Sequence, residues 1–275
     1  FRSLIDANRW RDIEGMDLQT VLNTIKNDKI DILVELGGHS AGSRLDIMAC
    51  KPAPVQVTWI GYANTTGLPT IDYRITDSIA DPRHTKQKHT EQLVRMPAPQ
   101  CFLCYSPNAD VPEVSPLPAL KNGYITFGSF NALGKINDRV LELWCNVLNE
   151  IPNSRFFMKC KHFSSDDIRE RFMNKFKSHG IDESRLTLIA LTPTIAEHMT
   201  LYSKIDIAVD SFPYAGTTTT AEALYMGVPV VTFQRLGMPI HAQNVGASLL
   251  SRIAGLDKFI ANSRDSYLAI CKEHA

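Results

Sequence analysis

Four consecutive threonines, Thr217–Thr220, follow a glycine and precede an alanine-rich helical pattern. Threonine is a mediocre helix former, but a helix that begins in this run would present free backbone N–H groups and the positive end of its dipole. A buried strand pattern ends just before it, at Asp210, and ligands of open α/β sheets bind at the carboxyl ends of strands. Simple N-capping would need one threonine rather than four. We therefore predict a diphosphate site in the segment made of Gly216, Thr217, Thr218 and Thr219.

A carboxylate lies one turn deeper on the same predicted helix. Glu222 follows Thr218 by four residues, so the two share one helical face. A carboxylate repels phosphate, but it can accept two hydrogen bonds from a neutral diol. This spacing predicts a ribose on Glu222 and phosphates at the helix start, which is the arrangement that a nucleoside diphosphate requires.

A second group of candidate residues lies in "FGSFNALGKIN", residues 127–137. A strand pattern ends there, small residues turn the chain, and Lys135 stands just before the next helix. A lysine after the first strand of a nucleotide-binding domain can neutralise a diphosphate leaving group. A solvated surface lysine would fit the position equally well.

The third candidate is a histidine in "TPTIAEHMTLY". Thr194 is a plausible N-cap, and Glu197 three residues later completes a capping-box pattern. His198 would then face the carboxyl end of the next strand, where it could stack on a nucleobase. A lone histidine is more often structural, so both interpretations stay open.

Two glycine-containing loops in the first half also follow strand patterns: "ELGGHSAG", residues 35–42, and "WIGYANTTGLPTIDY", residues 59–73. Their glycines allow a ligand to approach the backbone closely. His39 could bond a sugar or act on a proton, and it could equally be an ordinary loop histidine.

Unbroken apolar runs predict strands buried on both faces of a parallel sheet, at residues 30–36, 55–60, 124–127, 155–158, 185–189, 205–209 and 229–233. Helical patterns at 138–150 and 166–178 separate some of them. Repeated strand–helix–strand units indicate an α/β doubly wound fold. A proline-rich stretch, residues 106–123, predicts a connection between two domains. We place the end of an incomplete first Rossmann-like domain at residues 1–110, and a nearly complete nucleotide-binding domain at 111–275.

The composition excludes several classes of protein. The 275 residues are 44% hydrophobic and 21% charged with a formal net charge of zero, so no basic field indicates nucleic acid and no polybasic patch indicates a membrane surface. No segment approaches the roughly 20 apolar residues of a membrane span. Cys101 and Cys104 have C-x-x-C spacing, but no second pair or nearby histidine completes a zinc site. We expect reduced thiols and no metal.

The chain resembles the catalytic region of the protein O-GlcNAc transferase family, most closely its SPINDLY branch. The resemblance covers nearly the whole chain and rests on the segments "DILVELGGHSAG", "MACKPAPVQVTWIGY", "TGLPTIDYRITDSIADP", "FGSFNALGKI", "IPNSRFFMKC" and "DSFPYAGTTTTAEALYMGVPVVT". It implies a GT-B glycosyltransferase of two Rossmann-like domains, the first incomplete in this fragment, preceded by tetratricopeptide (TPR) repeats. We expect the family's histidine-proline segment to lie before Phe1 and its final helix after Ala275.

The family implies inverting, metal-independent transfer of a sugar to Ser/Thr hydroxyls of nuclear and cytoplasmic proteins, with no cofactor besides the nucleotide-sugar donor. The SPINDLY branch implies fucose from GDP-fucose, and the other branch implies GlcNAc from UDP-GlcNAc. A non-catalytic nucleotide-sugar-binding or scaffold module is the alternative from another class. Nothing in the resemblance indicates a nucleic-acid or membrane partner.

The resemblance also assigns roles to single residues. Lys135 matches the catalytic lysine at the diphosphate, and His198 matches a base-stacking histidine. The threonines match the phosphate-binding helix start, although the GlcNAc branch has histidine where Thr217 stands. The remaining matches are the acidic ribose ligand Glu222 and the backbone segment near the sugar, Ile60 and Gly61.

Two local features distinguish the chain within the family. Ala132 replaces the amide residue expected beside the lysine loop, which puts one diphosphate contact in doubt. Met199, Thr200 and Leu201 follow His198, where the GlcNAc branch has arginines that suit a uracil carbonyl.

Overall fold

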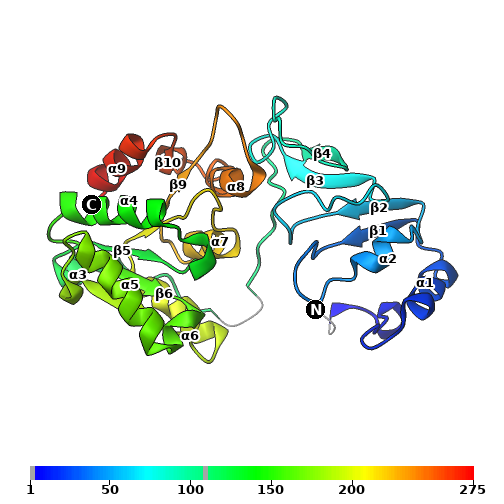
Figure 1. Ribbon diagram of the computed structural model, residues 1–275, viewed down its shortest axis with the longest axis horizontal. Coiled ribbons are helices and arrows are strands. Elements are labelled where there is room, and N and C mark those ends of the chain that lie inside the picture. The colour runs from blue at the N-terminus through cyan, green and yellow to red at the C-terminus, as the bar shows by residue number, and fades with distance from the viewer. Residues whose placement is uncertain (1–3, 108–110) are drawn as a thin grey trace. The chain divides into compact units, whose positions relative to one another are not determined.

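The computed structural model describes residues 4–107 and 111–275 (Figure 1). Contacts divide these residues into two compact units. The first comprises residues 4–76 with Lys88–Arg95, and the second comprises Asp77–Gln87 with Met96–Ala275. The second unit thus begins earlier in the chain than the expected boundary after residue 110. Residues 108–110 of the expected connection lie outside the described part, and on either side of them only a four-residue helix, α3 (Ala119–Asn122), forms before residue 123.

The first unit contains a four-stranded sheet with the order β1-β2-β3-β4. β1 pairs in parallel with β2, and β2 with β3. Helix α1 starts after Asp17, whose side chain accepts the Thr20 N–H as an N-cap. In chain order the elements are α1 (Leu18–Asn27), β1 (Ile32–Glu35), α2 (Leu45–Ala49), β2 (Val55–Thr58), β3 (Tyr73–Asp77) and β4 (Gln92–Met96).

Strand β1 departs from the expected double burial. It is an edge strand of the described sheet, and Ile32 and Val34 are 59% and 43% exposed. The apolar run at 30–36 correctly predicted a strand, but the prediction that both faces are covered is wrong, because the face with Ile32 and Val34 is exposed while Leu33 on the other face packs against the core.

The second unit contains a six-stranded sheet with the order β10-β9-β8-β5-β6-β7. Every pairing between neighbours is parallel, as expected from the unbroken apolar runs. The strand order is that of a dinucleotide-binding fold, whose order reverses between β5 and β8. Right-handed crossovers place helices on both faces of such a sheet. The elements are β5 (Thr126–Ser129), α4 (Asp138–Glu150), β6 (Arg155–Lys159), α5 (Asp166–Ser178), β7 (Leu186–Ile189), α6 (Ile195–Thr200), β8 (Ile207–Val209), α7 (Thr218–Tyr225), β9 (Val230–Phe233), α8 (His241–Leu250), β10 (Ile260–Ala261) and α9 (Arg264–Glu273).

Large apolar side chains fix the helices on this sheet. Helix α4 begins at the N-cap Asn137 and buries Trp144 completely against Phe156 of β6. Phe176 of α5 packs on the same ring, with centroids 5.3 Å apart. Burying such aromatic side chains stabilises the fold by several kcal/mol in total, at about 1.5–3 kcal/mol for each. None of the helices described is long and apolar enough to cross a membrane.

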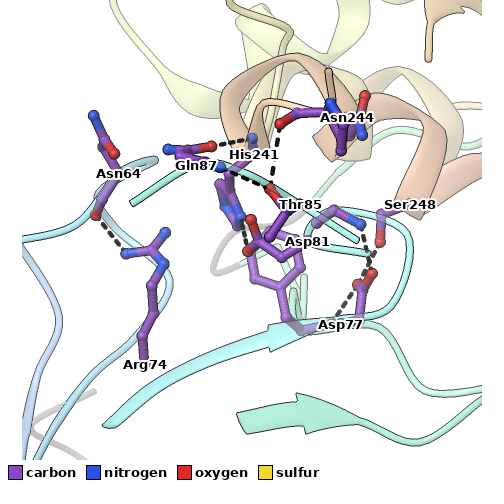
Figure 2. Close-up of polar contacts among 12 residues, drawn as sticks. Asn64, Arg74, Asp77, Asp81, Thr85, Gln87, His241, Asn244 and Ser248 are labelled. Atoms are coloured by element: carbon purple, nitrogen blue, oxygen red, sulfur yellow. Dashed lines mark hydrogen bonds and ion pairs between the residues drawn. The ribbon is translucent and has the colours of Figure 1, made fainter. Parts of the chain in front are cut away.

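Polar contacts attach the segment Asp77–Gln87 to helix α8, which explains its place in the second unit (Figure 2). Asp81 Oδ2 lies 2.7 Å from His241 Nδ1, and both side chains are buried. Gln87 Oε1 accepts the His241 backbone N–H at 2.9 Å. Asp77 accepts a hydrogen bond from the hydroxyl of Ser248, which lies about two turns after His241 in α8. These buried contacts hold the segment although its neighbours in sequence belong to the other unit.

Candidate functional site

Helix α7 begins within the threonine run, at Thr218, as expected. Its N-cap is Thr217, whose side chain makes no capping hydrogen bond, so simple N-capping does not explain the run. The Thr219 hydroxyl donates inward to Asn131 Oδ1 at 3.0 Å. The first backbone amides of a helix have no acceptor within the helix. In α7 they therefore remain available to an anion at the positive end of the dipole.

Gly216 shapes the turn into this helix. Its N–H donates to Asp210 Oδ1 at 2.7 Å, so this amide serves the fold and not a ligand. A Cβ atom at this position would lie 2.5 Å from Thr220 Oγ1 and 2.7 Å from Thr219 Oγ1. Only glycine therefore lets the turn approach the helix start so closely.

Replacing Gly216 with alanine should lower the free energy of unfolding by about 1–3 kcal/mol, because overpacking forces both threonine side chains to move. Urea denaturation of the two proteins measures the difference. Gly237→Ala is the matched control, since a Cβ there meets nothing within 4 Å. Equal losses in the two variants would contradict the proposed crowding.

Lys135 ends a 3-10 turn, Leu133–Lys135, between β5 and α4. Its Nζ donates to the Ala215 carbonyl oxygen at 2.8 Å and lies 4.0 Å from the centre of the Tyr214 ring. The interpretation as a solvated surface lysine is therefore wrong. Burial lowers the pKa of Lys135, and the nearby Asp210 carboxylate opposes that shift. The structure thus brings this cation to the turn that leads into α7.

Asp210, directly after β8, accepts hydrogen bonds from several segments at the carboxyl edge of the six-stranded sheet. Its Oδ1 accepts from Asn131 Nδ2 at 3.0 Å and from the Gly216 N–H, while Oδ2 accepts the Thr232 hydroxyl at 2.7 Å. Burial raises the pKa of Asp210, and the hydrogen bonds and Lys135 act in the opposite direction. Sequence reasoning used Asp210 only as a strand end. Asp210 is a charged residue directly after three apolar strand residues, and this position was the signal in the sequence that it is buried and has a structural role.

His198 and Glu222 meet although α6 and α7 carry them separately. His198 Nε2 lies 2.8 Å from Glu222 Oε2, and the Tyr202 hydroxyl donates to the same oxygen at 3.1 Å. Phe130 lies beside the imidazole, with ring centroids 5.6 Å apart. Among the described residues Oε1 of Glu222 has no hydrogen-bond partner, so one carboxylate oxygen is available to a ribose. Thr194 caps α6 by accepting the Glu197 N–H at 3.1 Å, as expected.

Two residues of this group were missed in the sequence. Tyr202 ends the segment at residues 192–202 that contains His198 but was given no role, and Lys159 follows directly after the predicted strand at 155–158. Lys159 Nζ lies 2.6 Å from His198 Nδ1. A lysine that closes an otherwise apolar strand, at the carboxyl edge where ligands bind, was the signal for it.

The remaining predicted residues belong to the first unit. His39 is exposed and its Nε2 lies 2.7 Å from the Thr66 carbonyl oxygen, so this nitrogen is occupied by the neighbouring loop. Ile60 has a φ of +67°, which is costly for a β-branched residue. A Cβ atom on Gly61 would lie 1.9 Å from the Leu36 carbonyl oxygen. That these residues approach the sugar stays a prediction.

The structure therefore brings Lys135, Thr218, His198 and Glu222 to the carboxyl edge of the six-stranded sheet. His198 and Glu222 are in direct contact, and Lys135 contacts Ala215 in the turn that leads into α7. The cation and the free helix amides suit a diphosphate, the carboxylate suits a ribose, and the imidazole suits a nucleobase. Together they match the parts of a nucleoside diphosphate. Their roles toward that ligand remain predictions.

Comparison with known proteins tests the family and the fold. Residues 7–105 and 117–275 match the model of glycosyl transferase family 41. The chain is 53% identical over 274 residues to a protein of Eustoma exaltatum subsp. russellianum named probable UDP-N-acetylglucosamine–peptide N-acetylglucosaminyltransferase SPINDLY, covering 100% of this chain and 29% of that relative. The chain spans less than a third of the length of the three SPINDLY relatives compared, from Eustoma exaltatum, Petunia hybrida and Arabidopsis thaliana.

Two solved structures bear on the fold. A variant of the Thermobaculum terrenum O-GlcNAc transferase is 35% identical and superposes with a TM-score of 0.89, covering 98% of this chain and 49% of that one. The E. coli trehalose-6-phosphate structure bound with UDP-2-fluoro glucose is 12% identical with a TM-score of 0.52, covering 94% and 69%. The predicted α/β fold of the GT-B glycosyltransferases and the predicted resemblance are confirmed. Because the family model matches most of its residues, the chain belongs to glycosyl transferase family 41.

Proposed function

We propose that this chain is the catalytic part of a protein O-glycosyltransferase. The observation that carries the proposal is Lys135, held through Ala215 beside a helix start whose first amides are uncapped. Such a place suits a diphosphate that gains negative charge as it departs. The relatives' names, which specify a peptide N-acetylglucosaminyltransferase, support a protein acceptor. Ser/Thr hydroxyls of nuclear and cytoplasmic proteins are the acceptors that we propose.

The proposed reaction is a single in-line displacement. The acceptor hydroxyl oxygen forms a bond to the anomeric carbon while the bond from that carbon to the β-phosphate oxygen breaks, so the anomeric configuration inverts. The hydroxyl proton leaves to a base that this chain does not identify. Negative charge then grows on the β-phosphate, where the Lys135 ammonium and the α7 amides would stabilise it without a metal ion or another cofactor.

A transfer assay with the full-length protein tests the proposal. The purified protein is incubated with a labelled nucleotide sugar and an acceptor protein, and label on Ser/Thr residues is measured. Transfer that depends on Lys135 supports catalysis. Nucleotide binding without transfer or donor hydrolysis would instead favour the alternative, a non-catalytic nucleotide-sugar-binding or scaffold module.

For the donor we propose GDP-fucose. His198 is followed by Met199, Thr200 and Leu201, which lack the guanidinium donors that would suit a uracil carbonyl, and Thr217 offers a hydroxyl where the GlcNAc branch has an imidazole. UDP-GlcNAc is the second candidate, and the names of the relatives favour it.

GDP should bind the intact catalytic region at least about tenfold more tightly than UDP, which corresponds to about 1.4 kcal/mol. The physical reason is the absence of uracil-suited donors after His198. Calorimetric titration with each nucleotide gives the two dissociation constants. Equal affinities, or tighter binding of UDP, would assign the chain to UDP-GlcNAc instead.

A further inference from the structure

A buried lysine at the carboxyl edge of the second sheet has no role in the reaction as proposed. Lys159 is the last residue of β6 and is only 6% exposed. Burial lowers its pKa, and the charge of Glu222 acts in the opposite direction. A buried ammonium is costly unless it is paired or hydrogen-bonded. Among the described residues its hydrogen-bond partner is His198 Nδ1, at 2.6 Å.

The chemistry of the three groups assigns the proton on the imidazole. An ammonium group donates hydrogen bonds and accepts none, so Nδ1 of His198 must accept from Lys159. The neutral ring then carries its proton on Nε2, and this N–H donates to Glu222 Oε2 at 2.8 Å. The other tautomer would direct an N–H at the ammonium and a lone pair at the carboxylate, which is unfavourable at both ends.

This chain of contacts also orients the carboxylate. Oε2 of Glu222 accepts from both His198 and the Tyr202 hydroxyl. The Tyr202 oxygen also lies 3.2 Å from the Thr219 carbonyl oxygen, so its single proton is shared between the two acceptors. The carboxylate is therefore fixed relative to the start of α7. Oε1 is left for the ribose of the nucleotide.

We propose that Lys159 is a positioning residue that holds His198 in its Nε2–H tautomer and thereby fixes Glu222 for the ribose of a nucleoside diphosphate. This inference rests on the proposed function for its ligand. Lys159 acts through His198, and the phosphate contacts at Lys135 and α7 do not depend on it. Its loss should therefore weaken binding of the nucleoside part and leave binding of the phosphate part unchanged.

The test combines Lys159→Met, which keeps chain length but removes the donors, with Lys159→Arg, which keeps a cationic donor. Nitrogen-15 NMR of histidine-labelled full-length protein reports the tautomer, with the His198 signal assigned by its loss in His198→Gln. The wild type and Lys159→Arg should show the Nε2–H tautomer, and Lys159→Met should populate the Nδ1–H tautomer. A wild-type Nδ1–H tautomer, or an unchanged tautomer in Lys159→Met, would overturn the proposal. The wild-type measurement tests it even if Lys159→Met fails to fold.

Binding supplies the second readout. Lys159→Met should weaken GDP or UDP binding by about tenfold, as expected for one mispositioned charge-assisted hydrogen bond, and should leave the affinity for inorganic pyrophosphate unchanged. In a Glu222→Ala background the same substitution should have no further effect. Equal weakening for pyrophosphate and nucleotide would show a general structural role and contradict the proposal. Failure of sugar transfer by the wild type would instead count against the proposed function, because the tautomer is measured without substrate.

Discussion

Replacing Lys135 with methionine should lower the turnover number for sugar transfer by about 10²–10³, the effect of removing one preorganised donor to a developing negative charge. The ammonium is held at the turn into α7 by Ala215, where charge grows only as the nucleotide departs. The loss should therefore fall mainly on kcat and less on KM. Initial rates with labelled donor at saturating acceptor measure both constants.

Lys177→Met is the matched control for this experiment. Lys177 lies on α5 in the same unit and its side chain is exposed, so its loss should leave transfer unchanged. A Lys135 variant with wild-type kcat would contradict the proposed role of Lys135 in stabilising the departing diphosphate. A variant that loses only donor affinity would show that Lys135 binds the ground state and the transition state equally.

Replacing Asp210 with alanine should lower the free energy of unfolding by about 3–5 kcal/mol. The substitution leaves the buried donors of Asn131, Gly216 and Thr232 without their acceptor, and each unsatisfied buried group costs about 1–3 kcal/mol. Urea denaturation followed by circular dichroism measures the loss.

Asp210→Asn separates hydrogen bonding from size in this experiment. Asparagine keeps Oδ1 for Asn131 and Gly216, and its amide can donate to the Thr232 hydroxyl, so we expect a loss of only about 1 kcal/mol. If the alanine and asparagine variants unfold at the same urea concentration, the hydrogen-bond network is not the source of the stability.

Patterns within single elements predicted most of the second unit. Five unbroken apolar runs coincide with strands β5 to β9 to within about two residues, because strands covered on both faces must be apolar throughout. The strands β3 and β4 were not predicted. β3 contains the buried Arg74, whose charge is satisfied by the carbonyl oxygens of Asn64 and Tyr62 at 2.6 and 2.7 Å. Such compensation depends on a loop folding back, which no local pattern contains.

The candidate site likewise contains residues that local patterns predicted and contacts that they did not. The positions of Lys135, Thr218 and Glu222 relative to strand ends sufficed to place them at one edge, because parallel strands all end on the same side. The bond between His198 and Glu222, and the part of Lys159 in it, depend on side-chain conformations across three elements. Spacing within one element carries no information on such contacts. The attachment of Asp77–Gln87 to α8 escaped prediction for the same reason.

The edge strand β1 has a practical consequence for handling this chain in isolation. Its outer backbone N–H and C=O groups have no partner strand in the described sheet, and the exposed side chains of Ile32 and Val34 line the same strand. An apolar open edge is a template on which another extended chain can add by backbone pairing. For this chain in isolation, we therefore expect the β1 edge to favour reversible self-association as the concentration rises.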